Sequence, residues 1–97
     1  MLVALCSLDI RIPGSRSLKE KRHVVKSLVS GLRGTFNVAV AEVEHQDLRQ
    51  RARLGVSAVG AEGYHLRKVM HQVERFAARQ PGVEIIDATV TIHGPDD

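Results

Sequence analysis

Strand-type and helix-type patterns follow one another along the 97-residue chain in the order β-α-β-β-α-β. This order predicts an α+β fold, the ferredoxin-like βαββαβ sandwich, in which a four-stranded antiparallel sheet carries two helices on one face. The right-handed connection between parallel strands makes this arrangement the simplest one for the order. The chain is long enough for one modest core and has no internal linker, low-complexity tract or repeat. We therefore predict a single domain over residues 1–97.

The first expected strand covers residues 2–12, where apolar side chains recur at every second position. Apolar residues on both faces of its first half indicate a central strand, and the sequence "PGS" after it ends the strand. Ser17 and Glu20 fit the capping box, which predicts that a helix begins near Leu18. This helix ends at Gly34, and its apolar side chains have the spacing of one buried stripe: Val25, Leu28, Val29 and Leu32.

Residues 35–45 are rich in β-branched side chains and predict the second strand. Asp47 and Gln50 could cap a short helical turn that runs through Ala52. Residues 54–61 then form the third expected strand, which two glycines weaken.

The second long helix is expected over residues 63–79, where apolar side chains form an almost continuous helical stripe. Pro81 and Gly82 stop it. Residues 83–93 predict the fourth strand, and an acidic "GPDD" end follows.

Targeting and redox signals favour a cytoplasmic protein. No apolar run approaches the ~20 residues that cross a bilayer, so no membrane contact is expected. The first residues lack a positive region and a small-residue cleavage site, which argues against a signal peptide. Cys6 is the lone cysteine, whereas a secreted domain of this size usually carries pairs.

Charge is distributed unevenly along a chain whose net charge is only +3. Residues 11–34 contain seven Lys and Arg against Glu20 alone, whereas four acids and no Lys or Arg lie from residue 84 onward. A local basic patch attracts anionic partners such as nucleic acid even on a nearly neutral protein.

The first turns of the first helix hold cations where the helix dipole disfavours them. Together with free backbone N–H groups, these side chains form a candidate anion-binding or RNA-binding site: Arg16, Lys19, Lys21, Arg22 and Lys26. Lys21 falls within the apolar sector, so we expect its stem to lie over the edge of the core and its ammonium to reach solvent. The alternative is a solvated helix face with no ligand.

Other candidate sites are weaker. Glu42 and Glu44 should share one face of the second strand, and with Asp47 they could bind a metal, or they could pair with downstream arginines. The five histidines show no zinc or catalytic spacing, and no phosphate-binding loop or nucleophile motif occurs. We therefore expect no catalytic residue, no metal and no cofactor. Cys6 should be a buried, inert thiol.

The sheet face away from the helices offers a different interaction surface. It lacks the aromatic residues with which an RNA-recognition motif stacks bases. Val3, Leu5, Val83 and Ile85 could form an apolar patch there instead. The alternative function is thus a homodimeric structural protein that packs through this open face and has no nucleic-acid role.

The run "SRSLKEKRHVVKSLVSGLRGTFNVAVAEVEHQDLRQRARLGVSAVG" resembles the bacterial family DUF503, also called the YlxP-like proteins. "SLKEKR" followed by "FNVAVAEVE" is the specific part, although Leu48 stands where many relatives have a bulky aromatic. The resemblance implies a ferredoxin-like fold and a cytoplasmic protein without assigned catalytic residues. Members are often encoded beside translation and ribosome-maturation factors, which implies an RNA or ribosome setting. RNA or ribosomal particles are therefore the expected partners of the basic helix start.

Overall fold

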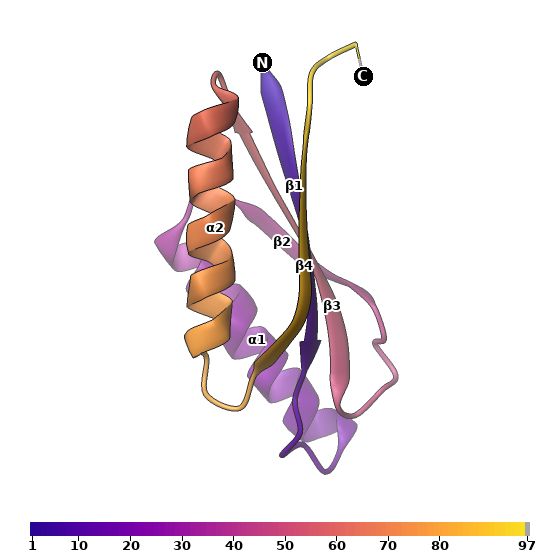
Figure 1. Cartoon of the computed structure of the whole chain (residues 1–97). Coiled ribbons are helices and arrows are strands. Elements are labelled where there is room, and N and C mark those ends of the chain that lie inside the picture. The colour runs from indigo at the N-terminus through magenta and orange to yellow at the C-terminus, as the bar shows by residue number, and fades with distance from the viewer. Residues whose placement is uncertain (97) are drawn as a thin grey trace.

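The computed structural model describes residues 1–96 and contains the expected elements in the expected order. They are β1 (Leu2–Arg11), α1 (Leu18–Thr35), β2 (Ala39–Glu44), β3 (Arg51–Gly60), α2 (Gly63–Arg79) and β4 (Glu84–His93). The strands form one antiparallel sheet in the order β2-β3-β1-β4, and both helices lie on the same side of it (Figure 1). The predicted ferredoxin-like fold is confirmed.

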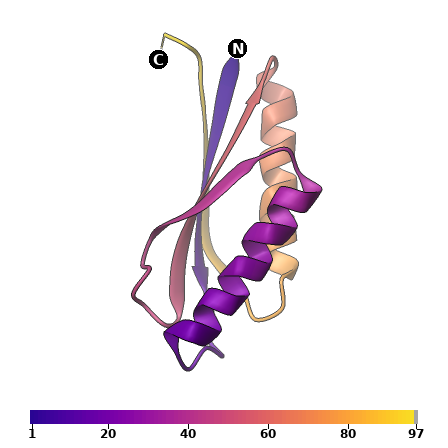
Figure 2. The same cartoon turned by 180° about the vertical axis from the view of Figure 1, so that it is seen from behind.

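The core lies between the helices and the two central strands, β1 and β3. Their helix-facing side chains alternate with open-face residues, as the strand period requires, and are buried from Ala4 to Ile10 and from Ala52 to Ala58. Each helix adds one buried apolar stripe (Val25, Leu28 and Leu32 from α1; Leu66, Met70, Val73 and Ala77 from α2). Seen from behind, α1 crosses the sheet obliquely and its first turns extend past the sheet's end (Figure 2).

The segment before β3 differs from the prediction of a short helical turn. Residues 45–50 form turns, and β3 begins at Arg51, opposite Arg11 of β1. The side-chain amide of Gln50 caps no helix; it donates to the carbonyl oxygens of Pro13 and Ser15. Pairing with the long central strand β1 satisfies this backbone more completely than one turn of helix would.

Candidate functional site

The start of α1 is capped as the sequence predicts. Ser17 Oγ accepts a hydrogen bond from the backbone N–H of Glu20 at 3.1 Å, and the Glu20 carboxylate accepts one from the N–H of Arg16. The carboxylate of Glu20 therefore already lies at the positive end of the helix. An anionic ligand here would be held mainly by side-chain cations and much less by free backbone donors.

Lys21 does not belong to this surface. Its side chain is fully buried, with Nζ 2.7 Å from Glu42 Oε2 in β2 and donating to the carbonyl oxygen of His45 at 2.6 Å. The expectation that its ammonium reaches solvent is wrong, and Lys21 cannot contact an external anion. Helical spacing correctly places Lys21 on the buried stripe, but its partner lies in a strand that is distant in sequence, so the helical pattern alone did not show the ion pair.

A β-bulge separates Glu42 from Glu44, so the prediction that both share one face is wrong. The register between β2 and β3 shifts between these residues. Glu42 consequently faces the helices and pairs with Lys21, whereas Glu44 lies 3.4 Å from the guanidinium of Arg53. Within residues 1–96, no three His, Cys, Asp or Glu side chains gather in a way that could hold a metal ion.

The four remaining predicted site residues are exposed: Arg16, Lys19, Arg22 and Lys26. They lie at the start of α1 and along its solvent-facing side, opposite the stripe that enters the core. None of them has an ion-pair partner among residues 1–96. The structure thus keeps four of the five predicted cations together at the surface.

Helix α2 adds a second set of exposed, unpaired cations that the sequence reasoning did not include: Arg67, Lys68, Arg75 and Arg79. Residues 16–35 and 62–79 together contain ten of the fourteen Lys and Arg, but only three of the eleven Asp and Glu. Because both helices lie on one side of the sheet, positive charge collects on that layer and negative charge on the other. We call the eight exposed cations of these two sets the helical cationic surface; Arg33 of α1 is exposed as well but donates to the carbonyl oxygen of Val40 and is not counted. Adding up the charges of each predicted helix, instead of looking only for cations that are neighbours in sequence, would have revealed this surface.

A groove of about 640 Å³ lies along the C-terminal half of α2, beside Phe36 at the end of α1. Gly31 lets the two helices approach closely next to it, because a Cβ there would lie 2.8 Å from the ring of Phe76. The rings of Phe36 and Phe76 meet edge to face, with centroids 5.9 Å apart. The groove is lined by these rings and by polar side chains (Gln72, Arg75, Arg79 and Gln80). Two aromatic rings thus lie beside the helical cationic surface, whereas the open sheet face has none among residues 1–96.

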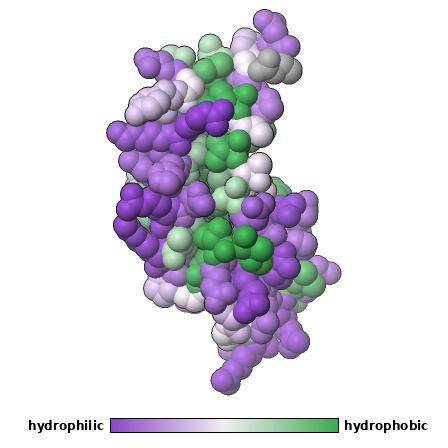
Figure 3. Space-filling view, in the orientation of Figure 1, coloured by the Kyte–Doolittle hydropathy of each residue, from purple (hydrophilic) through white to green (hydrophobic). Residues whose placement is uncertain are grey.

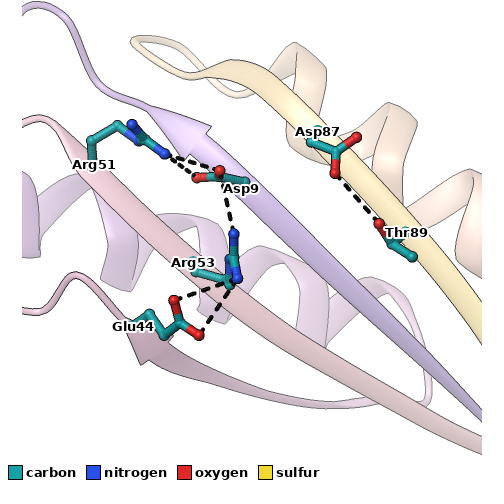
Figure 4. A network of polar contacts seen from close by, with 6 residues as sticks. All are labelled: Asp9, Glu44, Arg51, Arg53, Asp87 and Thr89. Carbon is teal, nitrogen blue, oxygen red and sulfur yellow. Dashed lines mark hydrogen bonds and ion pairs between the residues drawn. The ribbon is translucent and has the colours of Figure 1, made fainter.

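The open face of the sheet carries a different set of charges, which largely neutralise one another (Figure 4). Asp9, 8% exposed, accepts two hydrogen bonds from Arg51, at 3.0 and 2.9 Å. Arg53 lies between Asp9 and Glu44, at 3.5 and 3.4 Å. Because each guanidinium already has a carboxylate, this half of the sheet offers little free positive charge to an anionic ligand.

The apolar patch expected on the open face has different members. Val83 is buried and Ile85 packs against the same core on the helix side, so their assignment to the open face is wrong. The bulge that shifts the β1–β4 register after Ile85 changes which side chains face outward. The exposed apolar residues of the open face are Leu5, Val43 and Val59.

Cys6 lies on the core side of β1 and is buried, as expected. Burial raises the pKa of its thiol from 9.0 to about 11, and the nearby Glu74 carboxylate adds to the increase. At pH 8 the native protein should therefore hold about 100-fold less thiolate than the unfolded chain. We expect iodoacetamide to label Cys6 at least that much more slowly in buffer than in denaturant. Equal labelling rates would show that the thiol is not protected.

Comparison with known protein sequences shows the family of the chain. Residues 3–90 match the sequence model of DUF503, described as a protein family of unknown function. The chain belongs to the DUF503 family. A relative from Bacillus subtilis (strain 168), the uncharacterized protein YlxP, is 30% identical over 83 residues, which cover 86% of this chain and 90% of the relative.

Two solved structures resemble the chain in fold alone. The de novo designed protein Foldit4 has a TM-score of 0.53 at 10% identity, covering 95% of this chain and 97% of its own. A de novo designed protein with a ferredoxin fold, LFR1 1, has a TM-score of 0.54 at 13% identity, covering 96% and 84%. Among the residues described in this DUF503 protein, no helix is both long and apolar enough to cross a membrane.

Proposed function

We propose that this DUF503 protein is a non-catalytic RNA-binding module. The helical cationic surface contacts the phosphates of RNA, on ribosomal particles or their precursors. One observation carries the proposal: the exposed cations collect on the helical layer and lack ion-pair partners among residues 1–96. Lys and Arg in such an arrangement neutralise phosphates and supply sequence-independent affinity.

The position of the cations on α1 supports a ligand over a merely solvated helix. Lys19 and Arg22 lie in the first two turns, where the helix dipole opposes positive charge. Within residues 1–96, the acids of the sheet layer do not pair with these α1 cations. Asp9 and Glu44 pair instead with Arg51 and Arg53 of the sheet. A polyanion on the helical layer would offset the unfavourable placement of these α1 cations.

Two features favour RNA among polyanions. The groove beside α2 is lined by the rings of Phe36 and Phe76 together with Arg75 and Arg79, and unpaired bases stack on aromatic rings and guanidinium planes. The genes that often neighbour those of DUF503 proteins encode translation and ribosome-maturation factors, which supports the same setting.

Charge reversal on α1 tests the proposal. The double variant Lys19→Glu with Arg22→Glu should bind a fluorescently labelled single-stranded RNA about 10- to 100-fold more weakly, because it replaces two phosphate contacts by repulsion. Anisotropy titrations at low salt measure the affinity, and co-sedimentation with ribosomal subunits repeats the comparison on the expected partner.

The matched control is Arg11→Glu with Arg49→Glu, which makes the same change in net charge outside the helical layer. Both side chains are exposed, and Arg11 has only a surface ion pair with Glu84 at 3.5 Å. The control should keep RNA affinity within about threefold of the wild type. An equal loss in both variants would mean that only net charge matters, and unchanged binding by the α1 variant would refute the proposed site.

A further inference from the structure

The two edges of the sheet are not alike. β2 is six residues long, is interrupted by its bulge, and has the carbonyl oxygen of Val40 occupied by the guanidinium of Arg33 at 2.7 Å. These are the usual devices that prevent a strand edge from pairing. β4 is ten residues long and lies at the opposite edge, so one of its sides pairs with β1 and the other faces outward (Figure 1).

The helix-facing side of β4 is apolar but only partly covered. The corresponding residues of β1 and β3 are buried, whereas no residue of β4 is, although Ile85, Val90 and Ile92 pack against the core. Ile86, at the bulge, is 47% exposed. In Figure 3, apolar side chains run down the molecule along β4, beside the polar outer side of α2. β4 thus combines an unpaired backbone edge with a partly covered row of apolar side chains. We call this row, Ile85, Val90 and Ile92, the apolar strip.

If two copies of β4 run antiparallel with Val90 at the two-fold axis, each residue of 87–93 lies opposite a residue of matching chemistry in the other copy. On the helix side, Val90 then lies opposite the partner's Val90, and Ala88 opposite the partner's Ile92. On the open side, Thr89 lies opposite the partner's Thr91, and Asp87 opposite the partner's His93. Apolar, hydroxyl and charge-complementary pairs of these kinds stabilise neighbouring strands. The segment contains no bulge, so every residue keeps its face.

Within this segment, the Asp87 carboxylate would gain most from a cationic partner in the second copy. It lies directly opposite Asp9 of β1, and like charges in that position repel. Both nearby arginines are engaged by Asp9, while the one polar partner of the Asp87 carboxylate among residues 1–96 is the hydroxyl of Thr89, at 3.4 Å (Figure 4). At the other end of the segment, His93 contacts Thr91 at 2.9 Å, which holds its imidazole on the open side. In the paired strands, an imidazole from each copy would reach the unpaired carboxylate of the other.

We propose that the protein forms a two-fold symmetric homodimer in which the β4 edges of two copies pair antiparallel, with Val90 at the axis. The two sheets become one eight-stranded sheet, and the apolar strips of the two copies cover each other between the α2 helices. This interface is the strand edge, not the open sheet face, and it leaves the α1 cations uncovered, because α1 packs over β2 at the opposite edge of the sheet. The proposal is independent of RNA binding.

Sedimentation of the nuclease-treated protein is the first test. The wild type should approach twice the chain mass of 10.7 kDa in a concentration series, and Val90→Lys should remain a monomer. Val59→Lys is the matched control, because Val59 is 65% exposed in β3, away from the β4 edge, and this variant should dimerise like the wild type. A wild type that stays monomeric up to about 1 mM, or a dimer that Val90→Lys leaves intact, would overturn the proposal.

Cysteine cross-linking tests the register and needs no interface to be broken. In a Cys6→Ala background, Val90→Cys should form a disulfide-linked dimer under mild oxidation, because opposite Cβ atoms of paired strands are about 4.5–5.5 Å apart. Asp87→Cys should not cross-link with itself but should do so with His93→Cys in an equal mixture. Cross-linking of Asp87→Cys with itself, or failure of Val90→Cys to cross-link, would contradict this pairing.

Discussion

Replacing Lys21 by alanine should lower the free energy of unfolding by roughly 3–5 kcal/mol. The ammonium is buried and satisfied by Glu42 and the carbonyl oxygen of His45, so its removal leaves a mostly buried carboxylate without its cation. His45 has a φ of 66° and begins the turn after β2, so this contact also holds the β2–β3 connection against α1. Chemical denaturation followed by circular dichroism measures the change.

Two further variants separate the ion pair from helix propensity and from packing. Lys19→Ala removes an exposed lysine two residues earlier in α1 and should change stability by no more than about 0.5 kcal/mol. Combining Lys21→Met with Glu42→Leu should recover most of the stability, because well-packed apolar groups replace buried ion pairs at little cost. A loss below about 1 kcal/mol for Lys21→Ala would mean that the ion pair contributes little to stability.

RNA affinity should fall about 100-fold between 50 mM and 200 mM salt if about five phosphates are neutralised. The physical reason is counterion release: each cation–phosphate contact on single-stranded RNA adds about 0.7 to the slope of log affinity against log salt. The α1 variant Lys19→Glu with Arg22→Glu should therefore have a slope smaller by about 1.4. Anisotropy titrations at several salt concentrations give these slopes.

The sheet-side control, Arg11→Glu with Arg49→Glu, should keep the wild-type slope. Affinity that hardly changes with salt would point to apolar or neutral hydrogen-bonded contacts, and the phosphate-binding role of the helical cationic surface would be rejected. An α1 variant with reduced affinity but an unreduced slope would likewise show that Lys19 and Arg22 do not contact phosphates.

Much of this protein could be predicted because it depends on local patterns. The capping box of Ser17 and Glu20, the stripe from Val25 to Leu32 and the alternation in β1 involve residues that are neighbours in sequence. These features predicted the element order, and the order predicted the fold. The expectation that the α1 cations are exposed was right for Arg16, Lys19, Arg22 and Lys26.

The failures share a cause, which is that strand register depends on partners far away in the chain. The bulge after Glu42 turned one glutamate toward Lys21 and the next toward Arg53. The bulge after Ile85 placed that residue and Asp87 on opposite sides of β4. A one-residue shift exchanges the faces of a strand, so local alternation could not assign them.

The sequence by itself determined the elements, the apolar stripes and the number of cations, because side-chain periodicity and capping act over a few residues. Tertiary structure alone decided which lysine is buried, which carboxylates are paired and which strand edge stays open. The joint position of the α1 and α2 cations also came from the tertiary structure, since both helices must cover the same face of the sheet. Long-range packing thus divided one basic sequence, "SLKEKRHVVK", between a buried ion pair and a surface suited to an anionic partner.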